Sequence, residues 1–138
     1  YEISNFARGE DYIARHNSKY WHHVPYLGLG PAAHSFSRNM RWWNVRSVSE
    51  YCRFLTNGEL AVEDSETLTP EQIRLEQLYL GLRTKDGVDV SSTGADLNST
   101  GVLKALEDEE LVRICGSRLV PTRKGFLLAD SLPVLLSR

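Results

Sequence analysis

The residues best suited to chemistry lie close together near the start of the sequence, in the run His16-Asn17-Ser18-Lys19-Tyr20-Trp21. An imidazole, a carboxamide and two large amphipathic rings fall within one or two helical turns. This set suits a flat apolar ligand that carries a metal, because the imidazole can be an axial donor to iron and the rings can stack. The same residues also fit a structural loop in which Tyr20 and Trp21 fill a gap in the core. Residue types alone favour that structural interpretation.

A second stretch of interest is the small-residue run that begins at Gly28-Leu29-Gly30-Pro31 and continues to Phe36. Small residues after a strand let backbone or ligand approach closely. The run is not a dinucleotide fingerprint, because the third glycine is missing, and no Gly-Lys-Ser/Thr follows to make a phosphate loop. It therefore predicts either a tight strand-to-loop turn or a cleft rim at the end of a barrel strand, with His34 and Ser35 on the rim.

The remaining metal-binding residue types do not form a usual set. The four histidines include the adjacent pair His22 and His23, whose side chains point in different directions on any regular element. The two cysteines, Cys52 and Cys115, have no C-x-x-C spacing, so we expect reduced thiols in a cytosolic protein rather than a zinc site.

The overall composition is that of an ordinary globular protein, with 41% apolar and 25% charged residues and a net charge of −2. This balance provides no general attraction to phosphate backbones or anionic membranes. No apolar run is long enough to span a bilayer, and no signal peptide opens the chain. Residues 1–6 alternate like a strand already under way, so we expect this chain to be the C-terminal part of a larger protein.

The elements that must position these residues differ between the two parts of the chain. All four histidines and nine of the thirteen aromatic residues precede residue 47, which predicts a boundary between Arg46 and Ser47. In the first part, short strands are expected over 26–30 and 41–45.

The second part is predicted to consist mainly of amphipathic helices. Capping boxes at Ser47 and Thr69 begin two helices, which end at Asn57-Gly58 and Asp86-Gly87. The inward-facing stripes of these helices and of a third helix over 100–107 comprise Val48, Tyr51, Cys52, Leu55, Leu75, Leu78, Tyr79, Leu82, Val102, Leu103 and Leu106.

A hairpin over 111–120 and a last helix capped by Thr122 follow, and Pro133 is expected to kink or break that helix. Helix, hairpin and helix in this order outline a winged-helix-like domain. The acidic run Glu107 to Glu110 beside a helix that carries only Lys104 disfavours DNA binding, which needs a basic face. We therefore interpret this part as a packing or lid domain.

Taken together, three motifs resemble one family. Tyr1 to Ala7, then His-Asn-x-x-Tyr-Trp from His16, then Tyr26-x-Gly-x-Gly-Pro-x-Ala-His-Ser-Phe resemble the C-terminal part of the HemW family, the radical-SAM haem chaperones that are similar to oxygen-independent coproporphyrinogen III oxidase. Tyr79 to Arg83 and Gly87-Val88 also fit this family, so the resemblance covers nearly the whole chain.

The resemblance implies an α+β fold, with residues 1–46 as the last strands of a radical-SAM partial barrel and 47–138 as a helical, winged-helix-like C-terminal domain. It also implies a haem site at His16, Asn17, Tyr20 and Trp21. A [4Fe-4S] cluster and S-adenosylmethionine would bind upstream, at a C-x-x-x-C-x-x-C motif that this chain lacks. Ala32 stands where the family usually has glycine, and the added methyl argues against a cofactor role for that turn.

Three functions follow as expectations. The first is a cytoplasmic haem chaperone that passes haem to a respiratory protein and reaches a membrane only through that partner. The second is a coproporphyrinogen III oxidase, against which the His-Asn-x-x-Tyr-Trp motif argues. The third, from another class, is a winged-helix module that binds nucleic acid.

Overall fold

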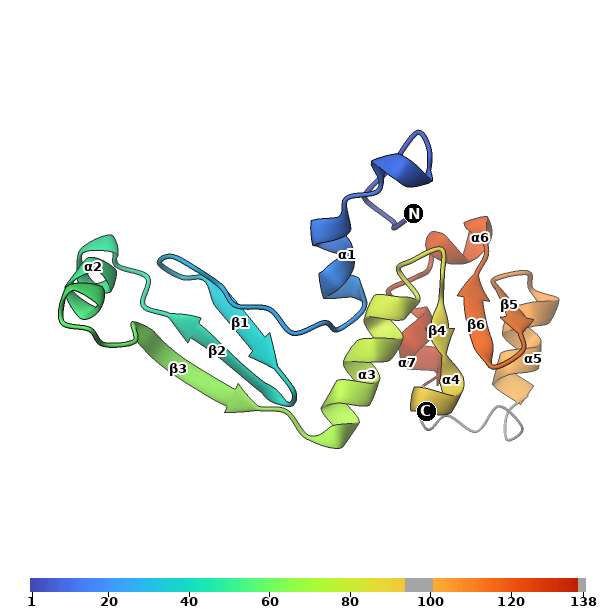
Figure 1. Cartoon of the computed structure of the whole chain (residues 1–138). Coiled ribbons are helices and arrows are strands. Elements are labelled where there is room, and N and C mark those ends of the chain that lie inside the picture. The colour runs from blue at the N-terminus through green and yellow to red at the C-terminus, as the bar shows by residue number, and fades with distance from the viewer. Residues whose placement is uncertain (94–100, 137–138) are drawn as a thin grey trace. The chain divides into compact units, whose positions relative to one another are not determined.

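The computed structural model describes residues 1–93 and 101–136, which divide into two compact units (Figure 1). Unit 1 combines Tyr1–His23 with Arg74–Arg138, and unit 2 is Val24–Ile73. The predicted boundary between Arg46 and Ser47 falls inside unit 2. The assignment of residues 1–46 to the end of a barrel stays a prediction.

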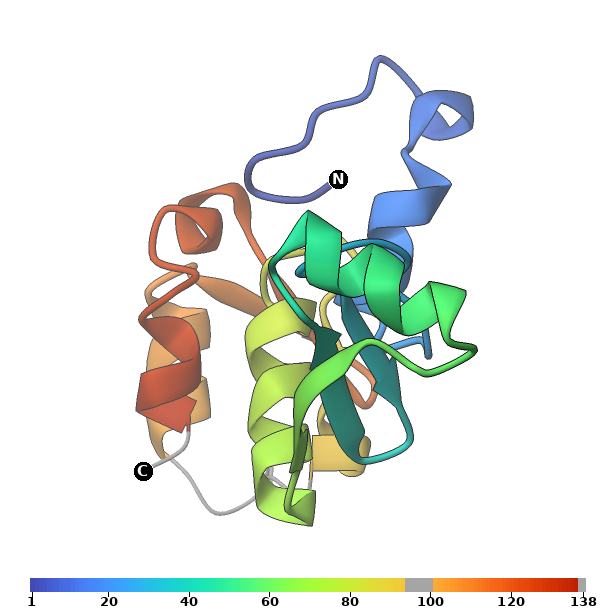
Figure 2. The ribbon, with the colours of Figure 1, turned by 90° about the vertical axis from the view of Figure 1, so that its left-hand side faces the viewer.

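Unit 2 is built on a three-stranded antiparallel sheet in the order β1-β2-β3. Its strands are β1 (His34–Ser37), β2 (Met40–Asn44) and β3 (Val62–Thr67), and α2 (Val48–Thr56) lies at one end of them (Figures 1 and 2). The strand predicted over 41–45 is therefore confirmed as β2. The strand predicted over 26–30 is absent, since only Tyr26 pairs, in a single bridge to Phe36.

Helix α2 forms where its capping signals predict. The Ser47 hydroxyl accepts a hydrogen bond from the Glu50 N–H at 3.4 Å, and Gly58 follows the helix with a φ of 75°. Its predicted apolar stripe, however, is not buried: Val48 is 66% and Leu55 is 52% exposed. Periodicity placed the apolar residues on one face correctly but did not reveal whether another element covers that face.

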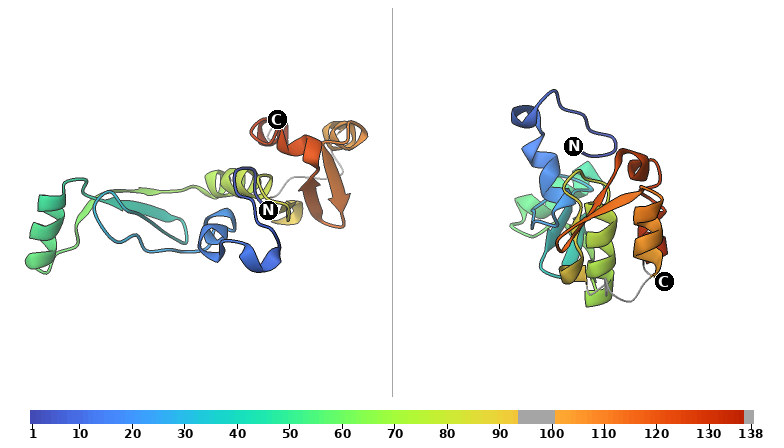
Figure 3. Two further views of the ribbon diagram at one scale, coloured as in Figure 1. Left: turned by 90° about the horizontal axis from the view of Figure 1, so that it is seen from above. Right: turned by 90° about the vertical axis from the view of Figure 1, so that its right-hand side faces the viewer.

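The C-terminal part of unit 1 is a small α+β domain. Its helices are α3 (Pro70–Gly81), α4 (Val90–Thr93), α5 (Gly101–Asp108), α6 (Arg123–Phe126) and α7 (Leu132–Leu136). Its second antiparallel sheet has the order β4-β6-β5, from β4 (Val88–Asp89), β5 (Val112–Cys115) and β6 (Arg118–Pro121). Helices α5 and α7 contact each other beside this sheet (Figure 3, right). The predicted order of helix, hairpin and helix is thus observed.

The core of this domain comes from the predicted apolar stripes and the hairpin. Its buried members are Leu78, Leu82, Val88, Val90, Leu103, Leu106, Leu111, Val112, Leu119 and Leu132. Several predictions were wrong. Helix α3 ends at Gly81 and not at Asp86-Gly87, and Leu75, which was predicted to face inward, is exposed. Val102 faces solvent rather than the core, and Pro133 does not break a helix but lies buried in the first turn of α7, where its missing N–H has no helical partner to lose.

The predicted caps at Thr69 and Thr122 are both confirmed. The Thr69 hydroxyl accepts from the Gln72 N–H at 3.1 Å, and the Gln72 side chain accepts in return from the Thr69 N–H at 2.8 Å. Thr122 accepts from the Gly125 N–H at 3.0 Å at the start of α6. These bonds satisfy N–H groups that a helix start otherwise leaves without acceptors.

The N-terminal segment attaches to this domain through its backbone. The strand predicted over 1–6 is reduced to one bridge between Glu2 and Thr84, flanked by a bond from the Ile3 N–H to the Arg83 carbonyl at 3.1 Å. The strand stops there because the Glu2 carboxylate accepts bonds from the Ser4 backbone and side chain, which turn the chain away. A short 3-10 helix, η1 (Glu10–Tyr12), and α1 (Arg15–Trp21) complete the segment. Within the described ranges, no helix combines the length and apolar character needed to cross a bilayer.

Candidate functional site

The His-Asn-x-x-Tyr-Trp motif forms nearly all of α1. The helix begins after Ala14, whose carbonyl accepts bonds from the backbone and the side chain of Ser18, both at 3.1 Å. It ends at Trp21 with His22 as its C-cap, and His23 then turns the chain with a φ of 56°. The motif is therefore presented on a regular helix and not on a loop.

Helical geometry divides the motif between two faces. His16 and Tyr20 are four residues apart, share one face and are both exposed. Asn17 and Trp21 are also four residues apart, share another face and are both partly buried. Only the first pair is presented to a ligand in solution, and the second pair faces the protein.

On the exposed face, the imidazole and the phenol form a pair. The His16 Nε2 atom lies 3.1 Å from the Tyr20 hydroxyl oxygen. The ring centroids are 5.4 Å apart and the ring planes meet at 80°, an edge-on arrangement. The imidazole is not enclosed in an apolar interior, so a ligand can reach it directly from solvent.

On the other face, Trp21 anchors α1 to the domain. The Arg83 guanidinium carbon lies 6.0 Å from the centroid of the indole ring, within the range of a cation–π contact. The indole Nε1 is buried and has no acceptor among the described residues. Trp21 also lines a hollow of about 180 Å³ together with His22, His23 and Arg118.

Polar and charged contacts reinforce this attachment. His23 Nε2 lies 2.9 Å from a Glu76 carboxylate oxygen. Arg83 contacts Asp130 at 2.7 Å and the buried Glu2 carboxylate at 3.4 Å. Burial raises the pKa of Glu2, but hydrogen bonds from Asn5 and Ser4 together with the Arg83 charge outweigh it, so its pKa lies below the ordinary value. Glu2 is therefore held ionised at neutral pH.

The second predicted pair, His34 and Ser35, lies in unit 2, whereas the α1 motif belongs to unit 1. Ser35 is fully buried, and its hydroxyl accepts a bond from the Gly28 N–H at 3.0 Å. His34 is exposed and its ring lies 5.6 Å from that of Trp43. Ser35 thus stabilises a turn.

The small residues of this stretch have backbone reasons to be small. A Cβ at Gly28 would meet the His34 carbonyl oxygen at 2.1 Å, so the two chain segments approach too closely for any side chain there. Ala32 has a φ of 56°, a left-handed conformation that disfavours residues other than glycine. Glycine would adopt this dihedral angle without that cost.

No cluster of three or more histidine, cysteine or acidic side chains able to hold a metal ion occurs in the part of the chain that the structure describes. Cys52 and Cys115 are free and exposed.

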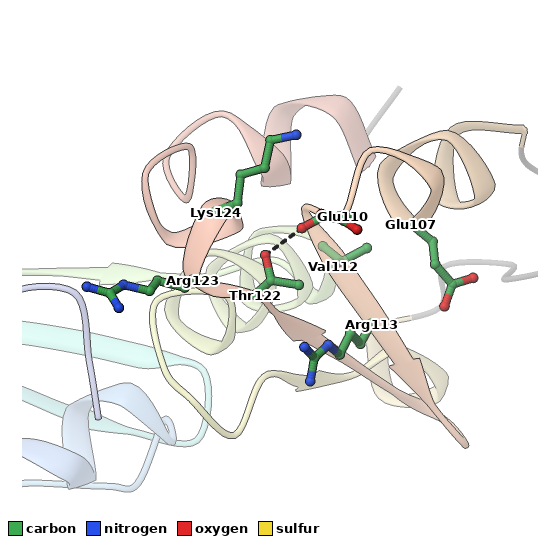
Figure 4. Close-up of a pocket in the computed structure, with 7 residues that line it drawn as sticks. All are labelled: Glu107, Glu110, Val112, Arg113, Thr122, Arg123 and Lys124. Carbon is green, nitrogen blue, oxygen red and sulfur yellow. Dashed lines mark hydrogen bonds between the residues drawn. The ribbon is translucent and has the colours of Figure 1, made fainter.

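Two further hollows were not expected from the sequence. One, of about 420 Å³, is lined by Glu107, Glu110, Val112, Arg113, Thr122, Arg123 and Lys124. Figure 4 shows the hydrogen bond from Thr122 to the Glu110 carbonyl, whereas Arg123, Lys124 and Glu107 point away from one another. The charged groups of these three side chains therefore do not converge on one point.

The other hollow, of about 470 Å³, belongs to unit 2 and is mostly apolar. Leu27, Leu29 and Leu60, which line it, are 70%, 80% and 83% exposed. The only sequence signal for this hollow was the presence of large apolar residues next to turn glycines, where solvent-facing polar residues are usual.

Comparison with known proteins shows that the sequence of this chain is similar to one group of proteins. Residues 68–128 match the family model described as the HemN C-terminal domain. Over 96% of its length the chain is 34% identical to the haem chaperone HemW of Mycobacterium tuberculosis, of which it covers 33%. It is 31% identical to the haem chaperone HemW of Bacillus subtilis, again over 96% of the chain and 36% of that protein.

A solved structure, the coproporphyrinogen III oxidase (HemN) of Escherichia coli, a radical SAM enzyme, superposes with a TM-score of 0.58. The identity is 19%, over 82% of this chain and 28% of that one, so this likeness concerns the fold. The chain spans about a third of the length of the curated relatives it matches.

Proposed function

Because this chain belongs to the HemW/HemN family, we propose that it is part of a HemW-type haem chaperone and that haem binds on the exposed face of α1. The observation that carries this proposal is the position of His16, whose imidazole is exposed on a regular helix next to the phenol of Tyr20. A nitrogen lone pair that a flat ligand can approach from solvent is the first requirement for an axial donor to iron.

The N-terminal segment that carries His16 has further exposed groups that suit a porphyrin. Phe6 and Tyr12, on the same N-terminal segment, are 87% and 74% exposed and offer apolar surface for a macrocycle. Arg15 and Lys19 lie on α1 beside His16 and are exposed, so they can pair with propionate groups. In this proposal Asn17 and Trp21 shape the site indirectly, by holding the helix on the domain.

The proposal extends to the whole protein through the family. The full-length protein would hold a [4Fe-4S] cluster and S-adenosylmethionine on polypeptide outside this chain, act in the cytoplasm, and pass haem to a haem-accepting respiratory protein. Residues 47–138, which contain the HemN C-terminal domain, would then pack against the catalytic part.

A haem titration followed by the Soret band tests the site. We expect the chain to bind ferric haem and His16→Ala to weaken binding at least tenfold, because the axial donor is lost. His22→Ala is the matched control, since His22 is also exposed and is the C-cap of the same helix. Equal titration curves for His16→Ala and the unaltered chain would remove His16 from the site.

The second candidate function is oxidation of coproporphyrinogen III, which the fold shared with HemN favours. It predicts turnover of this porphyrinogen by the full-length protein with S-adenosylmethionine and a reductant. The chaperone proposal predicts haem binding without such turnover, so one preparation distinguishes the two. A gel shift with duplex DNA at low salt tests the nucleic-acid alternative, for which binding must weaken steeply as salt rises.

A further inference from the structure

Strand β3 forms an open edge of the sheet in unit 2. Within the described residues it pairs only with β2, and all six of its residues, Val62–Thr67, are exposed (Figure 1). An uncovered edge strand presents backbone N–H and C=O groups that another strand can pair with.

The two faces of β3 differ in chemistry. The register places Ser65 opposite Trp42 and Thr67 opposite Met40, on the face that borders the apolar hollow. Asp64 and Glu66 are on the opposite face.

On the face that carries Asp64 and Glu66, one acidic residue already forms an ion pair with a basic residue. Glu66 lies across from Arg41, and their side chains form an ion pair at 3.2 Å on the β2 side. Asp64 accepts a hydrogen bond from the Ser65 N–H at 2.7 Å and lies across from Trp43.

The apolar hollow beside this edge is held open by specific bonds. The Asn44 side chain donates to the Gly30 carbonyl at 2.9 Å, and the Gly30 N–H donates to the Tyr51 hydroxyl at 3.0 Å. The loop that carries Leu27 and Leu29 is thereby tied both to β2 and to α2. A loop backbone that is already ordered lowers the cost of ordering this side of the hollow when a ligand binds.

A strand added next to β3 would have the apolar hollow beside one of its faces and Asp64 and Glu66 beside the other. Its residues beside Ser65 and Thr67 would lie on the side of the hollow, where apolar side chains gain by burial. Its alternate residues would lie beside Asp64 and Glu66, where lysine or arginine makes favourable cross-strand pairs. A second copy of β3 would instead place acidic residues next to acidic residues, which disfavours self-pairing.

We propose that β3 and the adjoining hollow form a docking surface for a partner protein, which contributes a strand whose apolar residues alternate with lysine or arginine. This surface lies entirely in unit 2 and does not use the α1 face proposed for haem. It therefore adds a partner site to the chain that is independent of the haem proposal.

The test uses the full 138-residue chain and a labelled peptide that alternates lysine and valine. We expect binding detected by fluorescence anisotropy, weakened at least tenfold by Asp64→Lys. For this variant, a peptide that alternates glutamate and valine should recover part of the binding, because Glu66 keeps its negative charge. Glu109→Lys, an exposed change of equal charge in unit 1, is the control and should leave binding unchanged. Leu60→Ser, which alters an exposed wall of the hollow, should weaken binding without unfolding the chain.

Three results would overturn the proposal. One is equal binding of a peptide with the same composition in which lysines and valines are blocked rather than alternated. Another is an equal effect of Asp64→Lys and Glu109→Lys, which would mean that only net charge matters. The third is concentration-dependent dimerisation in sedimentation that Asp64→Lys abolishes, which would make a second copy the occupant.

Discussion

The Nε2 atom of His16 lies 3.1 Å from the hydroxyl oxygen of Tyr20, one helical turn further along α1. Whichever of the two groups donates the proton, one imidazole nitrogen is engaged before any ligand arrives. In the haem proposal, iron coordination at Nε2 has to displace this hydrogen bond. Tyr20 is then a competitor for the imidazole as well as a ring against which a porphyrin can pack.

Replacing Tyr20 by phenylalanine separates these two roles. Tyr20→Phe keeps the ring but removes the hydroxyl, so we expect haem affinity to rise about fivefold, because a net hydrogen bond of about 1 kcal/mol no longer has to be broken. Soret titration measures the change, with Tyr79→Phe in α3, outside the residues proposed for haem, as the control. A lower affinity for Tyr20→Phe would mean that the hydroxyl contacts the ligand instead.

We expect replacement of Trp21 to reduce the stability of the fold more than replacement of His16 does. Trp21→Ala removes the ring that packs against Arg83 and should lower the free energy of unfolding by about 2 kcal/mol, whereas His16→Ala on the exposed face should change it by less than about 0.5 kcal/mol. Urea denaturation followed by circular dichroism compares the two variants. Equal losses would contradict the division of the motif between two faces.

The sequence correctly predicted the elements whose formation depends on residues close together in the chain. The caps at Ser47, Thr69 and Thr122 and the hairpin near Gly116 depend on residues a few positions apart, and all are present in the structure. Predictions that depended on distant contacts were less successful. The alternation over residues 1–6 could not reveal that Glu2 pairs with a segment around Thr84.

The candidate site was predicted in part for the same reason. The spacing of His16 and Tyr20 indicates a shared helical face once a helix is assumed, but which face is exposed depends on the packing of Trp21 near Arg83. The apolar hollow of unit 2 was missed because loop residues, β2 and α2 line it jointly, and no single periodic pattern includes all three.

Acid should weaken the attachment of the N-terminal segment. The pKa of Glu2 is depressed in the folded chain, so the stability that it contributes is present above the unfolded-state pKa and is lost as the pH falls through the lower folded-state value. We expect Glu2→Gln to cost about 1 kcal/mol at pH 7. The difference should shrink as the pH falls below about 4.

Urea unfolding at several pH values measures this trend, with Glu59→Gln, an exposed loop residue, as the control. A difference between Glu2→Gln and the unaltered chain that stays constant down to pH 3 would show that the ionised form of Glu2 is not the stabilising one.

Ala32 provides a stabilising substitution. Its φ of 56° is strained for alanine and ordinary for glycine, so Ala32→Gly should raise the free energy of unfolding by about 1 kcal/mol. Ala33→Gly at the next position, which does not have a positive φ, should lower it through the greater freedom of the unfolded chain. Thermal unfolding of both variants checks the prediction, and a shared sign would refute it.

The pairing of Glu2 with Arg83 joins residues 81 positions apart. During translation the segment that carries His16 and Trp21 leaves the ribosome several seconds before the polypeptide that receives it, at typical rates of chain elongation. Throughout that interval the indole ring, which the folded domain partly buries, is open to chaperones and proteases. The segment that carries the proposed haem face is therefore not held in place until the polypeptide around Arg83 has been synthesised.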